Sequence, residues 1–206
     1  MTTQPSSTKE LLLAAGQRLF ASRGIHAVSS KEILAAAQQK NASALQYHFG
    51  GRSGLLFAIL DRHNAKIEAE RKELLDADTS AELRPLVEAM VLPFARNLET
   101  AEGREFLKIV AQLGDEFEHW AVESAEAPIQ AQRALHLIVA NLSEREIGLS
   151  PAVRHERATR FLALISEALG ARARIVVEGQ PALNNEHFVA NLIDMSIGAL
   201  TAPSTL

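Results

Sequence analysis

The chain has 206 residues, of which 47% are hydrophobic and 22% charged, and its formal net charge at pH 7 is -4. These values are typical of a globular protein with a sizeable core and exclude a disordered chain. The absence of cysteine excludes disulfides, thiolate nucleophiles, iron–sulfur clusters and cysteine zinc sites. Apolar runs such as 134–142 are shorter than the roughly 20 residues that cross a bilayer. We therefore expect a cytoplasmic protein with no membrane partner.

The charge is divided unevenly along the chain. Residues 1–65 hold seven lysines and arginines against three acids, a net charge of +4, whereas the rest holds 14 basic and 22 acidic residues, a net charge of -8. A basic head on an acidic body indicates that one end of the molecule meets a polyanion and the other does not.

The first 50 residues predict three helices. Apolar residues at three- and four-residue spacings predict a helix over 7–23, with Ser7 and Glu10 as a capping box and Gly24 as its stop. Ser29 and Glu32 repeat the start signal before a short helix over 30–37. Residues 38–40 then interrupt, and Asn41 is the expected cap of a third helix over 42–49.

The remaining chain also predicts helices. One begins at Leu55, and others are expected over 83–98, 104–120, 129–141, 151–178 and 185–200, with prolines and glycines at their edges. The β-branched run 175–177 is expected to finish a helix, because a lone strand is not stable. The fold class is therefore all-α, with an N-terminal domain over 5–65 and a larger helical domain over 66–206.

Three short helices with a tight break between the second and third are typical of a helix-turn-helix, whose later helix enters the DNA major groove. The third helix ends in Leu45, Tyr47, His48, Phe49 and Gly50. With Leu-Phe, Arg-Gly, a capping serine and isoleucine upstream, in the segment 19–33, this ending resembles the DNA-binding domain of TetR-family transcription regulators. The resemblance covers about residues 5–65. It departs at Gln38, where the family commonly has glycine, and the turn is one residue longer.

The outward face of the third helix indicates how DNA would be read. If Leu45 and Phe49 face inward, Ser43, Ala44, Gln46 and Tyr47 face outward. Gln46 can pair bidentately with adenine, Ser43 can bond several bases, and Ala44 offers a contact to a thymine methyl group.

The resemblance implies further contacts and partners. Phosphate contacts are expected at residues of the second helix, the turn and the flanks of the third helix: Ser30, Lys31, Lys40, Tyr47, His48 and Arg52. Asn41 is also expected to contact DNA. The implied function is that of a ligand-responsive repressor, which binds a pseudo-palindromic operator in double-stranded DNA as a homodimer. A small-molecule effector is also implied, and no cofactor.

Two surfaces are expected in the larger domain. Apolar stripes on the last two helices suit pairing with a second subunit, or burial in the monomer core; they comprise Phe161, Leu162, Ile165, Leu169, Phe188, Leu192, Met195, Ser196 and Ala199. An effector pocket is implied among the central helices, where plain core residues are the alternative. Its candidates are Met90, Phe94, Phe106, Phe117, Trp120, Arg133 and His136.

A helical enzyme and an interaction module that does not bind DNA are the alternatives. The sequence has no His-Glu-x-x-His pair and no Gly-x-Ser-x-Gly turn, so we name no catalytic residue. Asp115, Glu118 and His119 share one side of an expected helix, but charged residues at this spacing favour a solvated face over a metal site.

Overall fold

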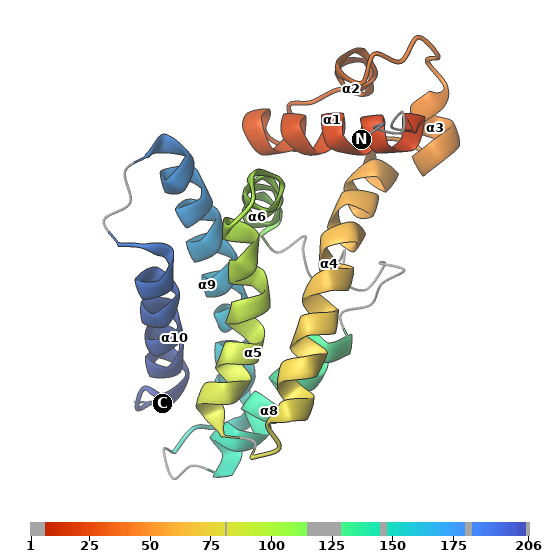
Figure 1. Ribbon diagram of the computed structural model, residues 1–206. Helices are drawn as coiled ribbons and strands as arrows, with labels where there is room; N and C mark the ends of the chain where they lie inside the picture. The colour runs from red at the N-terminus through yellow and green to blue at the C-terminus, as the bar shows by residue number, and fades with distance from the viewer. Residues whose placement is uncertain (1–6, 81, 115–128, 145–147, 180–182, 205–206) are drawn as a thin grey trace.

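The computed structural model describes residues 7–80, 82–114, 129–144, 148–179 and 183–204. The regular structure within these ranges is helical and contains no strand, which confirms the all-α fold (Figure 1). Among the described helices, none combines the length and the apolar character that crossing a membrane requires.

The head consists of α1 (Thr8–Arg23), α2 (Ser30–Ala36) and α3 (Ala44–Phe49), and α1 lies across the top of the rest of the molecule (Figure 1). Leu12, Phe20 and Ile33 are fully buried between these helices. At Gly16 a Cβ atom would lie 2.5 Å from a methyl carbon of Leu55, so this glycine allows α1 to lie close to the helix that carries Leu55.

The helix α4 (Arg52–Ala77) links the head to the body. Its 26 residues span about 39 Å at 1.5 Å per residue. It runs from beneath α3 down one side of the body (Figure 1). The boundary expected between residues 65 and 66 falls inside this helix, so one continuous helix runs through both predicted domains.

The body is formed by α5 (Leu83–Ala95), the 3-10 turn η1 (Arg96–Leu98), α6 (Ala101–Leu113), α8 (Ile129–Glu144), α9 (Pro151–Glu178) and α10 (Asn185–Thr201). Helix α6 packs against both α1 and α9, and α10 lies outermost, against α9 and α5 (Figure 1). At Gly170 on α9 a Cβ atom would lie 2.3 Å from that of Ala111 on α6. This glycine therefore permits the close approach of α6 and α9.

Two helices of the body differ from the expected ones. The helix expected over 83–98 divides into α5 and η1, two residues after Pro93, which supplies no backbone N–H. The helix expected over 104–120 begins earlier, at Ala101, and ends at Leu113, because Gly114 has a positive φ of 48°. The run 175–177 lies inside α9, as expected.

Candidate nucleic-acid interface

The start of α2 is held by a complete capping box. The Ser29 hydroxyl accepts a hydrogen bond from the Glu32 backbone N–H (3.3 Å), and the Glu32 carboxylate accepts one from the Ser29 N–H (2.8 Å). Arg23, at the end of α1, pairs with the same carboxylate at 2.7 Å. The hydrogen bonds from Ser29, followed by Arg23, lower the pKa of Glu32 to about 2. The loop between α1 and α2 is thus fixed in place.

The turn after α2 closes with two backbone hydrogen bonds. The Gln39 N–H donates to the Leu34 carbonyl (2.9 Å) and the Gln38 N–H to that of Ala35 (3.0 Å), which is the pattern of a Schellman motif. Gln38 has a φ of 54° and occupies the left-handed position that favours glycine. The departure noted in the sequence therefore changes the residue at this turn without changing its backbone bonds.

The third helix begins two residues later than expected. The Asn41 side chain accepts from the Ser43 N–H (2.9 Å) and forms an Asx turn, and α3 begins at Ala44. Ala44 is 5% exposed and packs into the head with Leu45. The prediction that Ala44 faces DNA is wrong, because the inward side of α3 is wider than expected and includes Ala44 and His48 beside Leu45 and Phe49.

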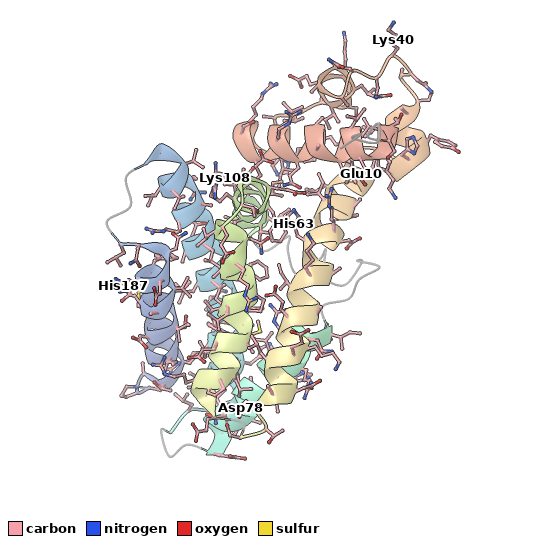
Figure 2. All side chains as sticks on the ribbon, in the orientation of Figure 1. Glu10, Lys40, His63, Asp78, Lys108 and His187 are labelled. Atoms are coloured by element: carbon pink, nitrogen blue, oxygen red, sulfur yellow. The ribbon has the colours of Figure 1, made fainter. Side chains whose placement is uncertain are left out.

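An exposed polar surface remains on α3 and the turn before it, and we call it the reading face. Its members are Lys40, Asn41, Ser43, Gln46 and Tyr47. Tyr47 is 84% exposed, an unusual degree for an aromatic side chain, and its ring meets that of the half-buried His48 edge-on at 5.0 Å. Lys40 lies at the tip of the head, away from the body (Figure 2).

Exposed cations flank the reading face. Ser30 and Lys31 are exposed at the start of α2, where backbone N–H groups also favour an anion. The Nζ of Lys9 lies 6.0 Å from the centre of the Phe49 ring, which places an ammonium group beside α3. Lys9, Lys31 and Lys40 form no ion pair within the described ranges, so they are available to phosphates. Sequence reasoning counted Lys9 as part of the basic head but did not assign it to the interface, because its position beside α3 is a tertiary contact.

Arg52 has a different position from the one expected. Its Nε donates to the Val28 carbonyl (2.8 Å), a second guanidinium nitrogen donates to the Ile25 carbonyl, and the group lies over the Phe20 ring. The side chain is half-buried and joins the start of α4 to the loop between α1 and α2. Arg52 thus holds the head together, a role that the sequence did not predict, and two of its guanidinium nitrogens already have carbonyl partners.

The pocket candidates divide into two groups. Met90, Phe94 and Phe106 are buried in the body, where the rings of Phe94 and Phe106 lie 5.9 Å apart. Arg133 and His136 are exposed on α8, and Arg133 pairs with Asp76 at the end of α4, so the expectation that these two face the interior is wrong. They fall on the outer side of α8, because Ala134 and Ile138 occupy its inner side. Phe117 and Trp120 lie outside the described residues, as do the acidic residues and His119 considered as metal ligands.

The dimer candidates divide similarly. The monomer core contains five of them, which is the alternative that the sequence left open for these stripes: Phe161, Ile165, Leu169, Leu192 and Ser196. Their stripes face α5 and α6 within the same chain. Leu162 and Phe188 are half-buried, whereas Met195 and Ala199 are exposed on α10. His187 also lies on the outer side of α10 (Figure 2).

Comparison with known proteins connects this arrangement to one family. Residues 12–59 match the family model for bacterial regulatory proteins of the tetR family. A comparison with curated protein sequences gives no match.

Similar solved structures extend the likeness to almost the whole chain. SmeT, the repressor of a multidrug efflux pump of Stenotrophomonas maltophilia, is 20% identical, with a TM-score of 0.59 over 94% of this chain and 90% of its own. NalD, the secondary repressor of a multidrug efflux pump in Pseudomonas aeruginosa, is 18% identical, with a TM-score of 0.58 over 95% and 96%. AmtR of Mycobacterium smegmatis is 16% identical, with a TM-score of 0.60 over 99% and 91%.

Proposed function

We propose that this chain is a DNA-binding transcriptional regulator of the TetR family, which represses transcription from a pseudo-palindromic operator until a small molecule releases it. Residues 12–59 match the model of that family, and the chain shares its fold with SmeT. The reading face is the observation that supports this proposal. It presents hydrogen-bonding side chains from a short helix braced by the rest of the head. Family membership favours this function over the helical enzyme and the interaction module.

The proposed contacts fall into two classes. Ser43 and Gln46 are proposed to contact base edges, where glutamine can bond adenine with two hydrogen bonds. Lys9, Lys31 and Lys40, with the hydroxyl groups of Ser30 and Tyr47, are proposed to contact phosphates, which fix the register of the head but carry little sequence information. Asn41 and His48 stay candidates for the second class.

A homodimer is proposed because one head can cover only half of a palindrome. Two-fold pairing would present two copies of α3 about one turn of DNA, roughly 34 Å, apart or a little more. The exposed side of α10, with Met195 and Ala199, is the proposed centre of the subunit contact. Its small residues would allow two helices to approach closely.

The effector is proposed to be a small, mostly apolar molecule. Met90 and Phe94 on α5 and Phe106 on α6 lie in the apolar interior of the body, where a bound molecule would touch both helices. SmeT and NalD, which share this fold, are repressors of multidrug efflux pumps. Protein and operator would meet in the cytoplasm, the compartment expected from the sequence.

The proposal is tested by selecting duplexes from a random-sequence pool with the full-length chain and measuring their binding by fluorescence anisotropy. We expect a two-fold symmetric sequence, bound at least 10³ times more tightly than a scrambled duplex, with an affinity that falls as salt rises. Gln46→Ala is expected to relax the preference at one base pair of each half-site. No selected sequence, or an affinity independent of salt, would contradict the proposal.

A further inference from the structure

A histidine is buried where the head, α4 and the body meet. His63 on α4 lies beneath α1 and beside α6 (Figure 2), is 7% exposed, and its ring is stacked on that of Phe106 with 4.3 Å between centroids. The residue is outside the reading face, and the proposed function assigns it no role.

Each ring nitrogen of His63 faces a side-chain carbonyl oxygen. Nε2 lies 3.2 Å from Oε1 of Gln17, which belongs to α1 of the head. Nδ1 lies 3.2 Å from Oδ1 of Asn97, which belongs to η1 of the body. The imidazole therefore joins the two parts of the molecule through polar contacts on opposite sides of its ring.

The other ends of the two amides fix their orientation. Nε2 of Gln17 donates to the Glu102 backbone carbonyl at 2.8 Å, and Nδ2 of Asn97 donates to the carbonyls of Pro93 and Phe94 at 3.3 and 3.2 Å. A backbone carbonyl can only accept, so the amide nitrogens must face away from His63. Both oxygens are left to face the imidazole.

A neutral imidazole cannot satisfy both oxygens, because it carries one N–H and one lone pair. Burial lowers the pKa of His63, with a smaller contribution from Lys66 and Arg62, while the hydrogen bond with Asn97 and the charge of Glu102 oppose this change. The ring is therefore neutral at pH 7. One proton is available for two acceptors, one on the head and one on the body.

We propose that His63 is a positioning residue at the head–body joint, where its single ring proton is shared between Gln17 and Asn97, and the tautomer with the proton on Nε2 ties α1 of the head to α4. This inference rests on the proposed function, in which the ligand-free form binds the operator. The tied head is then the binding form, because it holds the two copies of α3 at a fixed separation. Operator binding and the Nε2–H tautomer favour each other by linkage.

The ring nitrogens can be observed directly by 15N NMR of the full-length protein at pH 7, with the His63 signals assigned by their loss in His63→Gln. We expect intermediate shifts for both nitrogens in the free protein, which indicate two exchanging tautomers, and a move toward Nε2–H when the selected operator duplex is added. In Gln17→Met only the Asn97 oxygen remains, so Nδ1–H is expected to dominate. The same single tautomer in the free, bound and variant proteins would overturn the proposal.

The chain offers a matched control in Gln112 of α6, which also ties the body to the head. Its Oε1 accepts from the Ile25 N–H at 2.9 Å and its Nε2 donates to the Phe20 carbonyl at 3.3 Å, with no contact to His63. We expect Gln17→Met and Gln112→Met each to weaken operator binding about five-fold, because each variant loses side-chain hydrogen bonds between the head and the body. Only Gln17→Met is expected to change the His63 tautomer.

The two proposals fail in different ways. Absence of any preferred duplex would contradict the proposed function, whereas the tautomers of the free protein would still be measurable. A preferred duplex that binds wild type and Gln17→Met equally, with the same 15N shifts of the His63 ring in both proteins, would overturn only the proposal about His63.

Discussion

Replacing Arg52 with methionine is expected to destabilise the head while leaving the number of its phosphate contacts unchanged. In the structure this guanidinium donates to the carbonyls of Val28 and Ile25 and lies 5.4 Å from the centre of the Phe20 ring. Methionine keeps most of the aliphatic stem and removes all three interactions. The substitution therefore separates a role inside the head from a role at the phosphates.

The size of the effect follows from the contacts. Each hydrogen bond from the guanidinium is expected to contribute about 1 kcal/mol, below the usual contribution of a charged donor because Arg52 is only half-buried. The contact with the aromatic ring adds about 0.5 kcal/mol. The free energy of unfolding should fall by about 2 to 3 kcal/mol, which corresponds to a decrease of roughly 4–12 °C in Tm for a chain of this size.

Thermal and urea unfolding measure the loss, and titration of a non-specific duplex at several salt concentrations, below the unfolding temperature, measures the phosphate contacts. Lys40→Met is the control: it should change stability by less than about 0.5 kcal/mol but reduce the salt slope by about 1.8 for the two subunits of a dimer. Arg52→Met should leave the slope unchanged. A reduced slope with unchanged stability in Arg52→Met would refute this interpretation of its contacts.

Three further outcomes are expected. Gln38→Gly should stabilise the chain by about 0.5 kcal/mol in urea unfolding, because relief of the left-handed φ exceeds the added freedom of the unfolded chain, whereas Gln39→Gly should destabilise it; a loss of stability in both would contradict this. Gln46→Ala should cost roughly 1 to 3 kcal/mol of operator affinity and relax one base preference, and a uniform loss across sequences would show that the register is wrong. The folded state lowers the pKa of Glu32 to about 2, so its contribution is complete above the ordinary value of 4.5 and is lost as the pH falls toward 2. The stability difference between wild type and Glu32→Gln should therefore shrink between pH 5 and pH 2.5 in urea unfolding, and a difference that stays constant would count against the capping role.

Local signals predicted the long helices well. Helix α9 begins after Ser150, with Pro151 in its first turn, and ends at Gly179 in the left-handed conformation, all of which the sequence displays. The capping box of α2 is likewise a pattern within four residues. Such elements are predictable because the groups that start and stop them lie next to one another in the chain.

The orientation of α3 was less predictable, because six residues are too few for periodicity to define an inward face. Asn41 looked like a helix cap but closes a turn before the helix, and Ala44, expected outside, lies in the core. The position of Arg52 depends on carbonyls 24 and 27 residues earlier, and local patterns do not contain such contacts. In the body, the apolar stripes of α9 and α10 indicated buried faces, but they did not distinguish a neighbour in the same chain from a second subunit.

The most direct test of the account is a hydroxyl-radical footprint of the full-length protein on its selected operator. If two copies of α3 bind one duplex together, two equivalent protected patches are expected on one face of the duplex, related by the pseudo-dyad and centred about one helical turn, roughly 10 base pairs, apart or slightly more. Protection of a single half-site at saturating protein, or of a continuous stretch without symmetry, would contradict the claim that two copies of α3 engage one duplex together.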